Sequence, residues 1–302
     1  ASLSMSGTVF HFVRRADLMF GVGTSFTKHN MCMTVPPGKT MIQATNDPAD
    51  INKDYNIDYP IIGDAKLVLR QMIEACREIV GDNRKNVTAT AQEVSSEREA
   101  WLLEWRHKLT DNSTPINPYR VIWDFMHTIP PQDAIVTHDS GSPRDQIMPF
   151  YRSNGPRTYL GWGKSHGLGT GLGLTIGAKL AQPDKVCVNF MGDAAFGMVG
   201  LDFETAVRSN LPIITVVLNN STMAVETAAM ESSHRLFNTR DLGGNYAEMG
   251  AAMGGYSERI EDPSQVSAAF SRARKVTEEQ GRAVLLEFIT SSETEASHRR
   301  PF

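Results

Sequence analysis

The sequence has few cysteines, no long apolar run and no secretory signal at its start. Its 302 residues contain three widely separated cysteines, Cys32, Cys76 and Cys187, without the spacing of a disulfide framework or a Cys-rich metal site. No apolar run approaches the roughly 18 residues that a membrane-spanning helix needs, and residues 1–7 lack the charged and apolar regions of a signal peptide. The sequence therefore predicts a cytoplasmic protein with reduced thiols and no membrane partner.

An excess of charge of one sign is also lacking. The net charge is −4, and the 30 lysines and arginines are scattered rather than clustered. No surface for a polyanion is indicated, so nucleic acid is not an expected partner. The 41% hydrophobic content over 302 residues is enough for large cores in roughly two domains.

Strand and helix patterns alternate along the chain. Short apolar runs bounded by turn residues predict strands, and apolar positions at helical spacing predict helices. The expected strands are 16–22, 40–44, 134–137, 186–190, 213–218 and 283–289, and the expected helices are 64–79, 95–109, 118–129, 171–181, 201–209, 223–235, one ending at 253 and 263–280. A polar stretch, 81–91, is interpreted as a linker. This alternation predicts an α/β protein with parallel sheets flanked by helices.

The strongest chemical signal is the segment Gly192-Asp193-Ala194-Ala195 together with Asn220. Asp193 and Asn220 are 27 positions apart (193 to 220) and follow two consecutive buried strands. Both are therefore expected at the carboxyl edge of a parallel sheet, where ligands bind. A carboxylate, an amide oxygen and a nearby backbone carbonyl suit Mg²⁺, which keeps phosphate oxygens among its ligands. The small Ala194 and Ala195 let backbone N–H groups approach a diphosphate.

These residues resemble the signature of thiamine diphosphate enzymes of the acetolactate synthase and pyruvate decarboxylase group, which is Gly-Asp-Gly, a spacer of this length and Asn-Asn. The resemblance implies that Asp193 and Asn220 are metal ligands, with the Thr222 carbonyl as a third. It places three more residues beside the diphosphate: Gly192, Ala194 and Ala195. Alanine in place of the signature's second glycine departs from the pattern and disfavours a positive φ at that position. The alternative is that Asp193 and Asn220 only cap turns.

The resemblance assigns two more segments to the cofactor. Leu168 falls where the family places the bulky apolar residue that bends the cofactor, and its N–H and the His166 carbonyl would bond the pyrimidine. The loop after the strand 134–137 would contact the diphosphate, because Ser140 and Ser142 carry hydroxyl donors and Gly141 permits close approach of the backbone. Leu168 as an ordinary core residue and 140–142 as an ordinary turn are the alternatives.

Glu226 is the candidate catalytic acid. It stands in Met223-Ala224-Val225-Glu226, which resembles the threonine-valine-glutamate run that carries an active-site carboxylate in the decarboxylases. An apolar cleft would adapt such a carboxyl to proton transfer near neutral pH, whereas a solvated helix residue is the alternative. The segment lacks the Gln-Gly-Met and Gln-Trp of acetolactate synthases, so substrate and product stay open.

The N-terminal part resembles the second half of the family's central domain. The matching residues are Ala16-Asp17-Leu18, Gly21-Val22-Gly23, Asn46-Asp47-Pro48 and Gly63-Asp64-Ala65. The resemblance implies three parts: residues 1–88 as this half domain, 89–112 as a linker with a connecting helix, and 113–302 as a complete diphosphate-binding domain. Some relatives bind FAD in the central domain, and the short Gly21-Val22-Gly23 signal leaves FAD binding open.

The implied function is that of a lyase or carboligase that uses thiamine diphosphate and Mg²⁺ on a 2-oxo acid or related acyl donor. The family's essential glutamate belongs to a pyrimidine-binding domain that this sequence does not contain. A second polypeptide is therefore expected to supply that domain and the first half of the central domain, in a dimer or tetramer of such pairs. It would also cover the apolar edge that a half sheet exposes. The alternative is a regulatory or assembly subunit that kept the fold without turnover.

Overall fold

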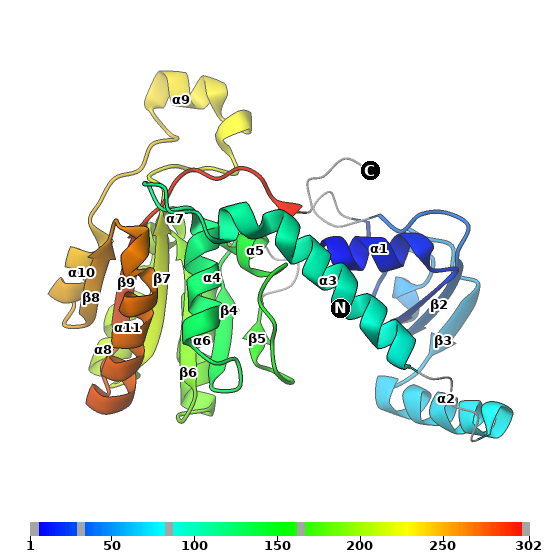
Figure 1. Cartoon of the computed structure of the whole chain (residues 1–302). Helices are drawn as coiled ribbons and strands as arrows, with labels where there is room; N and C mark the ends of the chain where they lie inside the picture. Colours follow the sequence, from blue (N-terminus) through cyan, green and yellow to red (C-terminus); the bar gives the residue numbers. More distant parts are fainter. Residues whose placement is uncertain (1–5, 29–33, 82–86, 162–166, 298–302) are drawn as a thin grey trace. The chain divides into compact units, whose positions relative to one another are not determined.

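A computed structural model of the chain describes residues 6–28, 34–81, 87–161 and 167–297 (Figure 1). The chain divides into two compact units, one within residues 1–104 and the other formed by residues 105–296. Each unit is built on a parallel sheet flanked by helices, which confirms the predicted fold class. Among the described residues, no helix is long and apolar enough to cross a bilayer.

The first unit contains a three-stranded sheet in the order β1-β2-β3, with both strand pairs parallel. Its elements are α1 (Gly7–Arg15), β1 (Leu18–Val22), β2 (Thr40–Thr45), η1 (Pro48–Asp50), β3 (Tyr59–Ile62), α2 (Ala65–Val80) and the first part of α3 (Thr88–Leu109). Helix α2 begins after Asp64 because the Asp64 carboxylate accepts the N–H groups of Lys66 and Leu67. It ends at Gly81, where φ is 59°.

Large apolar side chains of this unit are exposed. Tyr59 on β3 is 60% exposed, and Ile73 and Ile79 on α2 are 50% and 83% exposed. Strands β1 and β3 are the edges of the described sheet, and Leu18 on β1 is 45% exposed. The apolar exposure expected of a half sheet is therefore present in this unit.

The second unit contains a six-stranded parallel sheet in the order β5-β4-β6-β7-β9-β8 among the described residues. Its strands are β4 (Ala134–His138), β5 (Tyr159–Leu160), β6 (Val186–Gly192), β7 (Ile213–Asn219), β8 (Tyr256–Ile260) and β9 (Val284–Ile289). Its helices are α4 (Pro118–Thr128), α5 (Ser142–Ile147), α6 (Thr170–Ala181), α7 (Asp193–Val199), α8 (Asp202–Arg208), η2 (Thr227–Ala229), α9 (Glu231–Phe237), α10 (Tyr246–Ala252), η3 (Pro263–Gln265) and α11 (Val266–Gln280).

Helices cover both faces of this sheet, so its central strands are buried on both sides and are mostly apolar along their whole length. On one face, side chains of α6, α7, α8 and α10 pack with Cys187 and Val217 of the sheet. On the other face, Phe125 of α4 contacts Phe190 and Phe270, with ring centroids 5.0 and 5.4 Å apart. The unit is a three-layer α/β structure (Figure 1).

Several local predictions were wrong. Helix α3 begins at Thr88, so part of the expected linker 81–91 is helical. The expected helix 223–235 is divided into η2 and α9, because residues 222–223 pair with 240–241 in an extended arrangement instead. Strands β3, β5 and β8 and helices α1, α5 and α7 were not anticipated. The unpredicted β3 and α7 are only 4 and 7 residues long, too short for periodicity to reveal them.

Candidate functional site

The register of the central strands brings the two halves of the motif to one edge of the sheet. Strands β6 and β7 are hydrogen-bonded neighbours, and Gly192 is paired with Leu218. Asp193 comes directly after Gly192, as the first residue of α7, and Asn220 comes two positions after Leu218. The 27 positions from 193 to 220 are filled by α7, α8 and β7. The expected location at the carboxyl edge is therefore correct.

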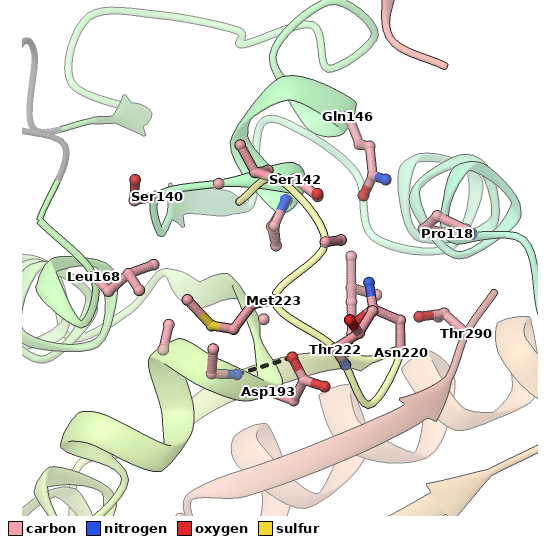
Figure 2. A pocket seen from close by; sticks show the side chains of 18 of the residues that line it. Pro118, Ser140, Ser142, Gln146, Leu168, Asp193, Asn220, Thr222, Met223 and Thr290 are labelled. Atoms are coloured by element: carbon pink, nitrogen blue, oxygen red, sulfur yellow. Dashed lines mark hydrogen bonds between the residues drawn. The ribbon is translucent and has the colours of Figure 1, made fainter. Parts of the chain in front are cut away.

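A pocket opens at this edge, between the loops that follow β4, β6 and β7 (Figure 2). Its lining includes every sequence-predicted site residue that the structure describes: Ser140, Gly141, Ser142, Leu168, Gly192, Asp193, Ala194, Ala195, Asn220, Thr222 and Glu226. His166 lies outside the described residues. Figure 2 shows Leu168 on one side of the opening, Asn220 and Thr222 on the other, and Asp193 between them. Their roles stay predictions, but their convergence is a property of the fold.

Asp193 is almost fully buried, with 2% of its surface exposed. Its Oδ1 accepts the N–H of Ala194 at 2.8 Å, whereas Oδ2 is buried without a hydrogen-bond partner in the described part of the chain. Burial raises the pKa of Asp193, and nearby backbone N–H groups, including those of Ala194, Ser221 and Thr222, act in the opposite direction. A buried carboxylate with one unsatisfied oxygen is costly unless a cation or a donor meets it.

The loop after β7 presents further oxygens. The side-chain Oδ1 of Asn220 accepts the N–H of Thr222 at 3.1 Å, and the Thr222 carbonyl accepts the N–H of Ala224 at 2.9 Å. The Thr222 hydroxyl is buried without a partner among the described residues. Two unsatisfied oxygens, Asp193 Oδ2 and Thr222 Oγ1, thus belong to residues that line the same pocket.

Ala194 stands where the family signature has glycine. It lies in the first turn of α7, with ordinary helical backbone, and is not among the described residues with positive φ. The substitution therefore carries no left-handed strain, and the anticipated penalty does not arise.

A buried carboxylate that the sequence analysis did not single out, Asp139, holds the loop after β4 in place. Asp139 is 0% exposed, and its Oδ1 accepts the N–H groups of Ser140 and Gly169, each at 2.8 Å. Its Oδ2 accepts the N–H of Gly171 at 3.0 Å. These bonds tie the loop after β4 to the beginning of α6, and so fix Ser140 relative to Leu168, which precedes Gly169 in the chain. The sequence signal that could have identified Asp139 is its position directly before the turn residues Ser140 and Gly141.

The loop 140–142 leads into α5. Gly141 has φ 81°, a conformation that a side chain disfavours, and α5 starts at Ser142 with Pro143 in its first turn. Gln146 follows one turn later, is 4% exposed and also lines the pocket. Sequence reasoning missed Gln146 because the short α5 was not predicted.

Glu226 lies at the rim of the pocket, and its side chain is exposed. The expected apolar cleft around this carboxyl is therefore not formed by the described residues, and residues 224–226 form a turn instead of a helix. In the described part of the chain, no three His, Cys, Asp or Glu residues converge as metal ligands. The candidate metal site consists of one carboxylate with amide, carbonyl and hydroxyl oxygens, a set that suits Mg²⁺ better than zinc.

Comparison with known protein families gives two matches. Residues 139–288 match the model described as "Thiamine pyrophosphate enzyme, C-terminal TPP binding domain", and residues 2–72 match "Thiamine pyrophosphate enzyme, central domain". The first match begins directly after β4 and contains strands β5 to β8 and all but the last residue of β9, with the loops that follow β4, β6 and β7.

Curated relatives match this chain over part of their own length. The acetolactate synthase isozyme 3 large subunit of Escherichia coli (strain K12) is 30% identical over 217 residues, which are 69% of this chain and 36% of that protein. The probable acetolactate synthase large subunit of Methanococcus aeolicus is 23% identical over 276 residues, covering 85% and 45%. The sulfoacetaldehyde acetyltransferase of Alcaligenes xylosoxydans xylosoxydans is 23% identical over 325 residues, covering 98% and 53%. The chain spans about half the length, or less, of these relatives.

Among solved structures, the crystal structure of benzoylformate decarboxylase from Polynucleobacter necessarius is similar, with a TM-score of 0.71. The alignment covers 95% of this chain and 52% of that chain at 19% sequence identity. At this identity the likeness supports the fold alone.

Proposed function

Because the chain belongs to the thiamine pyrophosphate enzyme family, we propose that it forms the Mg²⁺- and diphosphate-binding part of a thiamine diphosphate-dependent lyase or carboligase. The proposed substrate is a 2-oxo acid or a related acyl donor, as in acetolactate synthase-like enzymes. The observation that carries the proposal is the pair of unsatisfied buried oxygens, Asp193 Oδ2 and Thr222 Oγ1, in one pocket at the carboxyl edge of the sheet.

The donors at this edge fit a magnesium diphosphate. Asp193, Asn220 and the Thr222 carbonyl would hold Mg²⁺, and diphosphate oxygens and water would complete six oxygen ligands. A cation beside Asp193 would also remove the cost of burying its charge. The hydroxyls of Ser140 and Ser142 and the backbone of 192–195 line the same pocket, where they would donate to the diphosphate.

The chain's own residues would orient the reaction. Thiamine diphosphate, when bound, would supply a nucleophilic carbon and a cationic ring that accepts the electrons of the bond that breaks. Leu168 is partly buried against the core formed with α6, α7 and α8, so it is a fixed apolar support for a bent cofactor. Glu226 would donate a proton to the substrate carbon from which the leaving group departs. A second polypeptide over the rim would exclude water from Glu226 and adapt it to that role.

One observation supports a composite site. The pocket formed by the described residues has a volume of about 50 Å³, well below the roughly 300–1,000 Å³ of small-molecule sites. The proposed partner supplies the pyrimidine-binding domain and the first half of the central domain, in a dimer or tetramer of pairs, in the cytoplasm. FAD in the central domain stays open, and an absorption spectrum of the purified assembly in the flavin band decides it.

Calorimetry tests the proposal. The assembly purified with its partner is titrated with thiamine diphosphate in the presence of Mg²⁺ and again in the presence of a chelator. We expect saturable binding with one site per copy of this chain only when Mg²⁺ is present. Absence of binding by the assembly under both conditions would refute the cofactor assignment.

The exposure of Glu226 favours one alternative, a regulatory or assembly subunit that retains the fold without turnover. The same titration separates the two functions when it is combined with an activity assay. Mg²⁺-dependent cofactor binding without carbon–carbon bond formation or cleavage on any 2-oxo acid would favour the non-catalytic subunit.

A further inference from the structure

A third buried carboxylate lies beside the loop that follows β7. Glu287 on β9 is 0% exposed and is paired in register with Val217 on β7. Side chains two positions apart on a strand share a face, so Glu287 lies diagonally beside Asn219, the last residue of β7. The Glu287 Oε1 accepts Asn219 Nδ2–H at 2.7 Å, and its Oε2 accepts the N–H of Ala247, in the first turn of α10, at 2.9 Å.

Both Glu287 oxygens accept hydrogen bonds, and a neighbouring side chain supplies the positive charge that helps to stabilise a buried carboxylate. Arg259 is paired in register with Glu287 on β8, and its Nη1 lies 3.5 Å from Glu287 Oε1. This opposite charge and the two donated hydrogen bonds offset the cost of burial. Glu287 is therefore a fixed acceptor at the end of the sheet.

The acceptor fixes which way the Asn219 amide faces. A carboxylate has no proton to donate, so the Asn219 NH₂ group must face Glu287 and its oxygen must face away. That oxygen, Asn219 Oδ1, accepts both the N–H and the hydroxyl of Ser221, at 3.0 and 3.1 Å. Ser221 has φ 56°, in the left-handed region that non-glycine residues disfavour, and the two hydrogen bonds stabilise it there.

The turn at Ser221 sets the direction of the residues on either side. The Ser221 carbonyl accepts the N–H of Leu242 at 3.0 Å, and the N–H of Met223 bonds to the Arg240 carbonyl at 2.9 Å. Ser221 and Met223 are thereby tied by their backbones to the segment 240–242. The residues between and before them, Thr222 and Asn220, line the pocket.

We propose that Glu287 is a positioning residue of the cofactor site, which orients the Asn219 amide and so holds the Ser221 turn that presents Asn220 and Thr222 to Mg²⁺. The effect on Mg²⁺ rests on the proposed function, whereas the effect on the turn does not. Loss of the Glu287 acceptor lets the amide reverse, and Ser221 then loses the oxygen that accepts its N–H.

An exchange of the two side chains tests this orientation. Glu287→Gln alone places an NH₂ group against a donor, either that of Asn219 or that of Ala247. Combined with Asn219→Asp, it restores every hydrogen bond, but not the contact between Arg259 and Oε1: the new carboxylate accepts from Ser221 and from the introduced amide, whose carbonyl accepts from Ala247. The formal charge of the pair is unchanged. The matched control is Thr215→Val. Thr215 lies on the same strand as Asn219 and is as buried as Glu287, and its hydroxyl has no partner among the described residues.

The assembly that contains this chain is measured in two ways. For Glu287→Gln, we expect about a tenfold rise in the Mg²⁺ concentration that half-saturates thiamine diphosphate binding, the effect of losing one hydrogen bond to a charged group. Without Mg²⁺ or cofactor, we expect faster amide hydrogen exchange in peptides that cover residues 219–223. The exchanged pair should return both quantities to within about threefold of the original, and Thr215→Val should change neither.

The outcomes separate this inference from the function on which it partly rests. If the original assembly binds no thiamine diphosphate, the proposed function fails, and the hydrogen exchange alone decides the role of Glu287. Unchanged exchange in Glu287→Gln, or an exchanged pair as impaired as the single variant, would overturn the inference. If Glu287→Gln does not fold, recovery of folding and exchange by the exchanged pair supports it, and failure of the pair overturns it.

Discussion

The three hydrogen bonds that Asp139 accepts lead to a quantitative prediction about stability. Asp139→Asn keeps the shape of the side chain but replaces one acceptor oxygen with an NH₂ group. Asp139 Oδ1 accepts two backbone N–H groups and Oδ2 accepts one, so the new NH₂ group is best tolerated opposite the single N–H of Gly171. One hydrogen bond to a charged group is then lost, and the N–H of Gly171 is left buried without an acceptor.

The magnitude follows from these changes. A hydrogen bond to a charged group contributes about 1.5–3 kcal/mol, and an unsatisfied buried donor costs about 1–3 kcal/mol. Relief from burying a charge offsets part of this, so we expect the free energy of unfolding to fall by about 2–3 kcal/mol. For a unit of this size, the unfolding midpoint would fall by about 5–10 °C. The matched control is Asp184→Asn, an exposed aspartate in the same unit, with an expected change below about 0.5 kcal/mol.

Urea unfolding followed by circular dichroism measures both variants, with the slope of the transition as a check on the unfolded state. Because Asp139 also joins the 140–142 loop to the start of α6, calorimetry of the assembly should show weaker thiamine diphosphate binding in Asp139→Asn alone. Equal stabilities of Asp139→Asn and Asp184→Asn would refute the reasoning, because three backbone donors would then not depend on the carboxylate.

Three further changes probe the pocket. Burial raises the pKa of Asp193, so the charged carboxylate destabilises the metal-free fold above that pKa, and protonation removes this destabilisation as the pH falls through it. Asp193→Asn should therefore raise the unfolding midpoint at pH 7 but not at acid pH, which unfolding scans at several pH values would show. Calorimetry should show that the same variant has lost Mg²⁺-dependent cofactor binding. Glu226→Gln should lower the turnover of the assembly by about 100-fold and leave cofactor affinity unchanged; equal turnover would exclude it from proton transfer. Gly141→Ala introduces a side chain at φ 81° and should cost about 1–2 kcal/mol in urea unfolding, with weaker cofactor binding, whereas a neutral result would show that the loop adapts.

The sequence by itself determined most of the second unit. Strands 186–190 and 213–218 are apolar except for Asn189 and Thr215, because the sheet is covered on both faces, so they were recognisable without any partner. Because Asp193 and Asn220 follow these two strands, the sequence predicted both residues at the carboxyl edge of the sheet. The pairing of Gly192 with Leu218 in the structure agrees with this prediction. The fold class and the family are confirmed. The roles of the site residues stay predictions.

Other features were decided only by the tertiary structure. The two donors to Glu287 are 68 and 40 positions away, and two of the three donors to Asp139 are 30 and 32 positions away. The exposure of Glu226 was likewise hidden from local sequence. Periodicity reports which side of an element is apolar, but hydrogen-bond partners and solvation depend on which elements pack together. Local sequence therefore located the edge that carries the site, whereas packing across the chain determined how its loops are held.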